Sequence, residues 1–118
     1  MFYVGNAFSL NMVSDEDLLA RNIVAVPLTQ EAAQADLSAG FVSIVGHQST
    51  ADLFTSLLGV EVQNAGRVNA VLTPQDKLLV GQYSGPRLDE GVTELPAGSS
   101  IRWILVMLGD RADTIASL

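Results

Sequence analysis

The sequence predicts an α/β fold, a mixed central β-sheet of about five strands flanked by short helices. Two observations lead to this prediction. Apolar, β-branched segments alternate with helical patterns in the first half of the chain, and apolar segments then follow one another in the second half. The 118 residues contain no internal repeat, linker or low-complexity segment, so residues 1–118 are expected to form a single domain.

The chain begins with a short apolar segment, Phe2–Gly5, which predicts the first strand. Asn6 and Ser9 follow it, and because both are common N-cap residues they predict a short helical turn. Residues 15–20 are predicted to be a polar connection or a marginal helix. The β-branched segment Asn22–Leu28 then predicts a second strand.

A surface helix and a buried strand are predicted next. Thr29–Ala39 is rich in alanine and glutamine, with Thr29 placed to cap a helix and Gly40 placed to end it. Phe41–Val45 is apolar and β-branched, as is typical of a buried strand. The two segments continue the alternation of strands and helices that favours an α/β sheet.

A tight turn and a short amphipathic helix are predicted between Gly46 and Gly59. Ser49, followed three residues later by Asp52, resembles a capping box at the start of a helix, and Gly59 is an expected stop. The inward face of this helix is predicted from apolar residues at helical spacing, which are Leu53, Phe54, Leu57 and Leu58.

His47 is the one histidine of the chain and is expected at the open N-terminus of this helix. Unpaired backbone N–H groups and the positive end of the helix dipole attract anions there, phosphates especially. A capping or hydrogen-bonded structural role is the alternative for a single histidine. A zinc site is not expected, because one histidine and no cysteine cannot supply the usual ligands.

The second half of the chain predicts a hairpin and a long loop. Arg67–Leu72 and Lys77–Tyr83 are separated by the turn Thr73–Asp76, so an antiparallel hairpin is predicted. Gly85-Pro86 then breaks the strand pattern and opens a loop that runs to Ser100.

The last elements are a strand and the C-terminal tail. Ile101–Leu108 is apolar enough to be a central strand, and Gly109–Leu118 is predicted to be a weak helix or a frayed end. In the loop before this strand, Arg87 and Glu90 are three residues apart, and a solvated surface pair is the ordinary interpretation of such charges.

The predicted turns also indicate where a ligand would bind. In α/β sheets, ligands lie beyond the carboxyl ends of parallel strands. The Asn6 turn and the His47 turn each follow a predicted strand, so they share one edge of the sheet if those strands are parallel. Gln82 and the Arg87 loop belong to a further strand whose direction the sequence does not fix. The residues by themselves therefore predict an anion site at His47.

Composition excludes several classes of protein. A net charge of −7 with scattered basic residues argues against a binder of duplex nucleic acid. The absence of cysteine excludes a disulfide scaffold and a thiol nucleophile. The longest apolar run, Trp103–Leu108, is too short to cross a bilayer, and Met1–Val4 does not look like a signal peptide. We therefore expect a cytoplasmic protein without a membrane partner.

Three short blocks of the sequence resemble a known family. Asn6-Ala7-Phe8-Ser9-Leu10-Asn11-Met12, Gly46-His47-Gln48-Ser49-Thr50 and Arg87-Leu88-Asp89-Glu90-Gly91 occur in this order and at about this spacing in the viral ring nucleases. Arg67-Val68 is a weaker fourth block. These anti-CRISPR proteins degrade cyclic tetra-adenylate, the second messenger of type III CRISPR systems, and have relatives in phages, plasmids and bacterial genomes. The resemblance implies a single ring-nuclease-like domain that acts as a homodimer without a metal or other cofactor.

The resemblance also implies roles for individual residues. His47 matches the catalytic histidine, and Arg87 and Glu90 match a loop arginine and glutamate. The residues implied to bind the ligand are Asn6, Ser9, Ser49, Thr50 and Gln82. The chain departs from the family at Gly85-Pro86, where the segment is one residue longer, and in a shorter C-terminal part.

The expected function is thus a metal-independent ring nuclease, a phosphodiesterase that yields linear di-adenylates with 2′,3′-cyclic phosphate ends. RNA supplies its own nucleophile, the 2′-hydroxyl, and imidazole is a suitable general acid near neutral pH. Two alternatives stay open. The chain could bind cyclic oligonucleotides as a sponge without cleaving them, or serve a structural or protein-interaction role.

Overall fold

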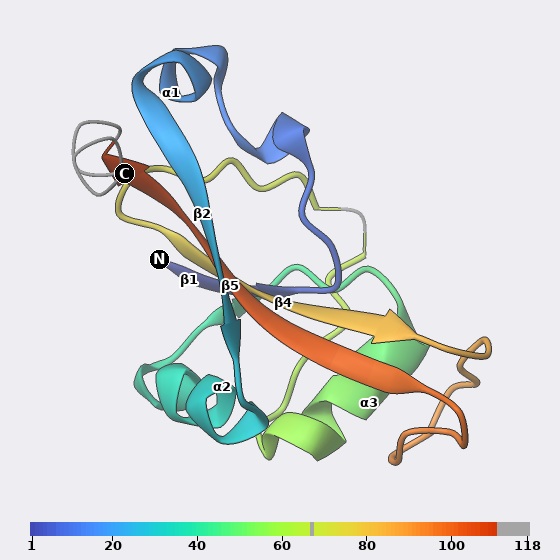
Figure 1. Ribbon diagram of the computed structural model, residues 1–118. Coiled ribbons are helices and arrows are strands. Elements are labelled where there is room, and N and C mark those ends of the chain that lie inside the picture. Colours follow the sequence, from blue (N-terminus) through green and yellow to red (C-terminus); the bar gives the residue numbers. More distant parts are fainter. Residues whose placement is uncertain (67, 111–118) are drawn as a thin grey trace.

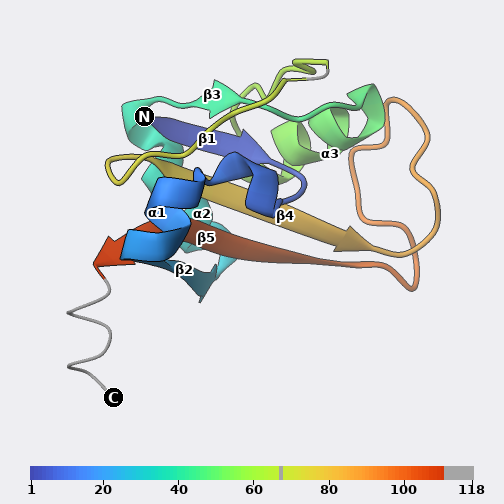
Figure 2. The same cartoon turned by 90° about the horizontal axis from the view of Figure 1, so that it is seen from above.

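Five strands form one mixed sheet in the order β2-β5-β4-β1-β3, which confirms the predicted fold class (Figures 1 and 2). The computed structural model describes residues 1–66 and 68–110. The strands are β1 (Phe2–Gly5), β2 (Arg21–Leu28), β3 (Val42–Ser43), β4 (Lys77–Ser84) and β5 (Ser100–Asp110).

The strand directions bring several carboxyl ends to one edge of the sheet. β1 is parallel to both β3 and β4, so these three strands end at the same edge. β5 is antiparallel to β4 on one side and to β2 on the other. The long loop between β4 and β5 therefore begins at the edge where β1 and β3 also end (Figure 2).

Short helical segments connect the strands, and local capping signals explain most of them. They are η1 (Leu10–Met12), α1 (Asp15–Ala20), α2 (Gln30–Asp36), η2 (Leu37–Ala39) and α3 (Gln48–Leu58). The Thr29 hydroxyl accepts a hydrogen bond of 3.1 Å from the backbone N–H of Ala32, which confirms the predicted cap of α2. Ser9 caps η1 and Ser14 caps α1 in the same way, so the marginal helix at residues 15–20 forms.

The sheet is covered on both faces. In Figure 1, α2 and α3 lie on one side of it, whereas η1 and the chain before β4 lie on the other. The core on the helical side contains Val4, Val45, Phe54, Leu58, Leu79 and Trp103. The core on the opposite side contains Ile44, Leu72, Leu78, Val80 and Val106. The predicted inward face of α3 is confirmed, since Leu53, Phe54 and Leu58 are buried and Leu57 packs against the core.

The strand predicted over Phe41–Val45 is shorter than expected. Only Val42–Ser43 forms β3, which is the last strand at one edge of the sheet. The Ser43 hydroxyl accepts a hydrogen bond of 3.2 Å from the backbone N–H of Val45, and the Val45 carbonyl accepts one from Ala65. At Val45, hydrogen bonds to Ser43 and Ala65 thus take the place of pairing with β1, so the strand stops early.

The predicted hairpin between Arg67–Leu72 and Lys77–Tyr83 is wrong. Lys77–Tyr83 lies within β4, but residues 68–72 form no strand, and Arg67 lies outside the described residues. Both edges of β4 are occupied, one by β1 and the other by β5. The backbone N–H of Leu72 donates instead to the Met12 carbonyl at 2.7 Å, so this segment packs on the N-terminal region.

The long loop and the last strand agree with the prediction. No strand or helix forms between Ser84 and Ser100, and β5 lies between two other strands. β5 continues through Gly109 and Asp110, where the start of a weak helix was expected, because these residues pair with β2. The remainder of that predicted tail, residues 111–118, lies outside the described residues. No helix in residues 1–66 and 68–110 has the length and apolarity needed to span a membrane.

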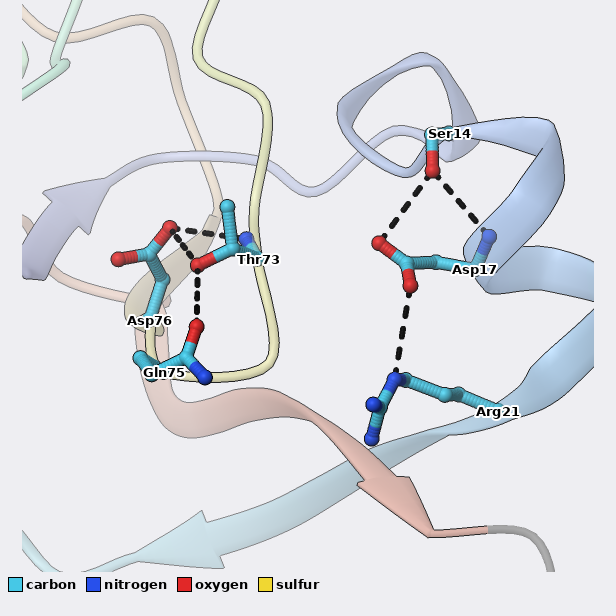
Figure 3. Close-up of polar contacts among 6 residues, drawn as sticks. All are labelled: Ser14, Asp17, Arg21, Thr73, Gln75 and Asp76. Carbon is cyan, nitrogen blue, oxygen red and sulfur yellow. Dashed lines mark hydrogen bonds and ion pairs between the residues drawn. The ribbon is translucent and has the colours of Figure 1, made fainter.

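Asp76 fixes the turn that leads into β4 (Figure 3). Its carboxylate accepts hydrogen bonds from the Thr73 backbone N–H at 2.8 Å and the Thr73 hydroxyl at 3.0 Å, and it contacts the Met1 ammonium at 3.1 Å. Burial by itself would raise the pKa of Asp76, but these hydrogen bonds and the ammonium charge outweigh it and hold the pKa below the ordinary value. In the same view, Asp17 joins Ser14 to Arg21 at the start of β2.

Replacement of Asp76 by alanine is expected to lower the free energy of unfolding by about 1–3 kcal/mol, because it leaves the Thr73 N–H unpaired. Since the folded pKa is lowered, the stabilisation is present above about pH 4, the ordinary pKa of an aspartate, and is lost as the pH falls through the folded value. Urea unfolding of wild type and variant between pH 7 and pH 3 checks both points. Gln75→Ala, in the same turn, is the control. The prediction would be contradicted if the difference in free energy of unfolding between wild type and Asp76→Ala did not shrink in acid.

Candidate functional site

An open groove lies at the carboxyl end of β4, beside the N-terminus of α3. It has a volume of about 720 Å³ and runs between the first turn of α3 and the loop that follows β4. Five of the residues singled out in the sequence line it together, namely His47, Ser49, Thr50, Arg87 and Glu90. Residues more than 35 positions apart in the chain are thus brought to one groove.

His47 is itself the N-cap of α3, which corrects the predicted start of the helix. Its backbone is extended, with φ −133° and ψ 137°, and its carbonyl accepts the first helical hydrogen bond from Ala51 at 3.0 Å. The capping box expected from Ser49 and Asp52 does not form, because Ser49 lies inside the first turn. The His47 side chain is exposed and makes no capping hydrogen bond, so it is free to meet a ligand in the groove.

The other wall of the groove is the loop after β4. Gly85 has φ +152°, and a Cβ atom on it would lie 2.5 Å from the Ser99 Cβ, so this position requires glycine. The Tyr83 hydroxyl donates a hydrogen bond of 2.6 Å to the Pro86 carbonyl. Gly85-Pro86 therefore forms a defined corner in which the two ends of the loop approach each other, and Arg87 follows it directly.

Arg87 and Glu90 are both exposed and do not form an ion pair with each other. Together with His47 and Asp89, they give the groove one permanent cation, one titratable imidazole and two carboxylates. An arginine that lines the same groove as a helix N-terminus suits a bound phosphate, because its guanidinium can donate two parallel hydrogen bonds.

Asn6 lies beside the groove rather than in it. It lines a neighbouring cavity of about 440 Å³ together with Gly46, His47 and Asn69, so His47 is shared between the two cavities. A Cβ atom on Gly46 would lie 3.2 Å from the Gly66 carbonyl oxygen, which shows how closely the segment before Asn69 approaches the His47 turn. A ligand large enough to fill both cavities would contact Asn6 and His47 together.

Ser9 and Gln82 lie apart from the groove. The Ser9 hydroxyl accepts a hydrogen bond of 3.3 Å from the Asn11 backbone N–H, and Ser9 lines a separate cavity with Asn69. Gln82 is exposed on β4, and because side chains alternate along a strand it lies on the opposite face from Tyr83, which lines the groove. The structure of one chain therefore does not bring these two predicted ligand residues to His47.

Several residues of the groove were missed in the sequence. Tyr83 lines it and holds the Gly85-Pro86 corner, although the sequence places it in an ordinary strand. Gln48 lines it as well, and its amide donates a hydrogen bond of 2.8 Å to Asp52. The spacing of four residues between Gln48 and Asp52 on a helix could have indicated this pair.

No group of three or more histidine, cysteine, aspartate or glutamate side chains that could hold a metal ion occurs in the part of the chain that the structure describes. The chemistry that the groove offers from its own side chains is anion binding and proton transfer.

Comparisons with known proteins relate the chain to a viral protein. A family model described as STIV B116-like matches residues 2–97, a range that includes every residue of the groove. Among solved structures, the chain is similar to B116 of Sulfolobus turreted icosahedral virus, with 24% sequence identity and a TM-score of 0.71 over 90% of this chain and 97% of that chain. At this identity the structural likeness shows a shared fold. No curated protein sequence matches the chain.

Proposed function

The chain belongs to the STIV B116-like family, and from the three sequence blocks that resemble the viral ring nucleases we propose that it is a metal-independent ring nuclease that cleaves cyclic tetra-adenylate. The products are linear di-adenylates with 2′,3′-cyclic phosphate ends. The observation that carries this proposal is the groove in which His47 at a helix N-terminus faces the loop that bears Arg87 and Glu90.

The chemistry needs few groups from the protein. The 2′-hydroxyl of one nucleotide attacks the adjacent phosphorus, so that a P–O2′ bond forms and the P–O5′ bond breaks. His47 protonates the departing 5′-oxygen as general acid, and the proton of the 2′-hydroxyl passes to solvent. Arg87 and the first backbone N–H groups of α3 stabilise the charge that accumulates on the phosphate oxygens.

The remaining residues position the ring. Ser49 and Thr50 line the groove beside His47 and bind phosphate or ribose oxygens. Glu90 orients either His47 or a ribose hydroxyl from the opposite wall. Asn6 binds a neighbouring nucleotide in the adjoining cavity.

The proposal includes a homodimer. A ring of four identical nucleotides has a two-fold axis, which matches a two-fold dimer that presents each groove twice. Two opposite phosphates of the ring would then meet two His47 side chains. Duplication of Arg87 and of the α3 N-terminus also adds positive features at the binding surface of a chain whose net charge is −7.

The proposal is tested by incubating the protein with cyclic tetra-adenylate in excess EDTA and following the ring by chromatography. We expect complete conversion to di-adenylates, because none of the groups assigned to the reaction is a metal. Linear tetra-adenylate is the control substrate, since equal cleavage of it would indicate a general ribonuclease. An intact ring after prolonged incubation would reject the nuclease.

A second candidate is a sponge that binds cyclic oligonucleotides without cleavage. The corner at Gly85-Pro86, which the Tyr83 hydroxyl holds, favours it because it sets the path of the loop that carries Arg87. Stoichiometric binding of the ring in the same samples, without product, would support the sponge over the nuclease. No binding of any cyclic oligoadenylate would leave a structural or protein-interaction role.

A further inference from the structure

Asp52 joins the loop after β4 to α3 through a hydrogen bond between residues 39 positions apart. One carboxylate oxygen of Asp52 accepts the backbone N–H of Gly91 at 2.9 Å, and the other accepts the Gln48 amide at 2.8 Å. Gly91 directly follows Glu90 in the loop, and Gln48 directly follows His47. Asp52 therefore connects the two walls of the groove without lining the groove itself.

The hydrogen bond between Asp52 and Gly91 lies in a different cavity from the groove. Gln48 lines both the groove and a second cavity of about 710 Å³, whereas Asp52 and Gly91 line the second cavity alone. The hydrogen bond between Asp52 and Gly91 thus lies in the second cavity and outside the lining of the groove. Asp52 reaches the groove only through its two partners, the loop at Gly91 and the side chain of Gln48.

The loop has little else to hold it over the helix. Its other hydrogen bonds among the described residues stay within it or lead to β4, as in Val92 to Asp89, Ser99 to Pro96 and Tyr83 to Pro86. Gly91 has φ +83°, so the chain turns sharply at the residue whose N–H Asp52 accepts. A carboxylate acceptor makes this a charge-assisted hydrogen bond, stronger than one between neutral groups.

We infer that Asp52 is a positioning residue that holds the Arg87–Glu90 segment over the groove, so that Arg87 meets the phosphate opposite His47. This inference rests on the proposed ring nuclease for its catalytic part. The structural part, that Asp52 restrains the loop, is independent of any substrate and is tested separately.

Hydrogen exchange with mass spectrometry on the free protein tests whether Asp52 restrains the loop. In Asp52→Ala, peptides from residues 85–99 are expected to exchange faster than in the wild type, while peptides from β4 and β5 keep their rates. Asp36→Ala is the matched control, because Asp36 is an exposed aspartate at the end of α2 whose side chain makes no capping hydrogen bond. Unchanged exchange in residues 85–99 of Asp52→Ala would overturn the inference.

The catalytic part is tested by steady-state cleavage of cyclic tetra-adenylate. Asp52→Ala is expected to lower kcat by roughly 10- to 100-fold with a smaller change in KM, since misplacing a group that stabilises the transition state costs rate. Asp52→Asn keeps an oxygen that can accept the Gly91 N–H, so it is expected to retain most of kcat and the wild-type exchange of the loop. A thermal midpoint near that of the wild type shows that the variants are folded.

The outcomes separate the two proposals. Faster loop exchange and a lower kcat in Asp52→Ala, both rescued in Asp52→Asn, support the positioning role. An unchanged kcat in Asp52→Ala overturns it, and so does a kcat in Asp52→Asn that is as low as in Asp52→Ala. If the wild-type protein leaves the ring intact, the proposed nuclease fails, and the exchange of residues 85–99 still decides whether Asp52 restrains the loop.

Discussion

Replacement of His47 by alanine is expected to lower the cleavage rate of cyclic tetra-adenylate by about 10²–10⁴-fold, because the departing 5′-oxygen loses its proton donor. Binding of the ring should change little. The backbone N–H groups at the start of α3, Ser49, Thr50 and Arg87 remain in the groove, and the His47 side chain makes no capping hydrogen bond whose loss would unfold the helix. Single-turnover cleavage with protein in excess, combined with titration of the ring, measures the two effects separately.

Lys77→Ala is the control for this experiment, because Lys77 is exposed at the opposite end of β4 from the groove. It should cleave at the wild-type rate. A His47→Ala variant that cleaves at a rate close to that of the wild type would show that another group donates the proton. A variant that loses binding and cleavage to the same extent would assign His47 to binding alone.

Replacement of Gly81 by alanine is expected to destabilise the fold strongly, by about 3 kcal/mol in the free energy of unfolding. A Cβ atom on Gly81 would lie 2.4 Å from the Phe54 ring and 2.5 Å from the Trp103 ring. These two rings pack edge to face with centroids 5.0 Å apart, and both are buried, so neither can move aside without disturbing the core between β4 and α3. Urea unfolding followed by circular dichroism measures the loss.

A double variant identifies the cause of this loss. Phe54→Leu by itself leaves space beside Gly81 and should also destabilise the fold. The double variant Gly81→Ala/Phe54→Leu should nevertheless lose less free energy of unfolding than the sum of the losses in the two single variants. Ser84→Ala, an exposed change on the same strand, is the control and should be close to neutral. Additive losses would show that the clash with Phe54 is not the reason.

The elements with local signals were predictable from the sequence. Phe2–Gly5 forms β1 as expected, and the Thr29 cap and the Gly40 stop bound the helical segment between them. Such signals act within a few residues, so the sequence shows them directly. The Gly59 stop is another example, with the left-handed backbone that favours glycine after a helix.

The wrong predictions concern partners distant in the chain. The apolar segment at residues 68–72 looks like a strand, but its neighbour in space is the N-terminal region, since Leu72 bonds to Met12 and packs against Leu78. β4 pairs with β1 and β5, a choice that no signal near the turn at Asp76 reveals. Likewise the carboxylate of Asp52, which looks like half of a capping box, bonds to a loop 39 residues away.

The candidate site was predictable where its residues follow each other in the sequence. His47, Ser49 and Thr50 line the groove because they begin one helix, and Arg87 and Glu90 join them because β4 is parallel to β1 and β3. The sequence could not fix that direction. Nor could it show which face of β4 carries Gln82 and which carries Tyr83, since that depends on the register of the whole sheet.

A transesterification at His47, in which the RNA supplies the nucleophile, can be distinguished from hydrolysis by the mass of the products formed in ¹⁸O-labelled water. The expected product is a di-adenylate with half the mass of the ring and no ¹⁸O, because the 2′-hydroxyl attacks and no water is added. A product that is heavier by one labelled water from the first turnover onward would contradict it.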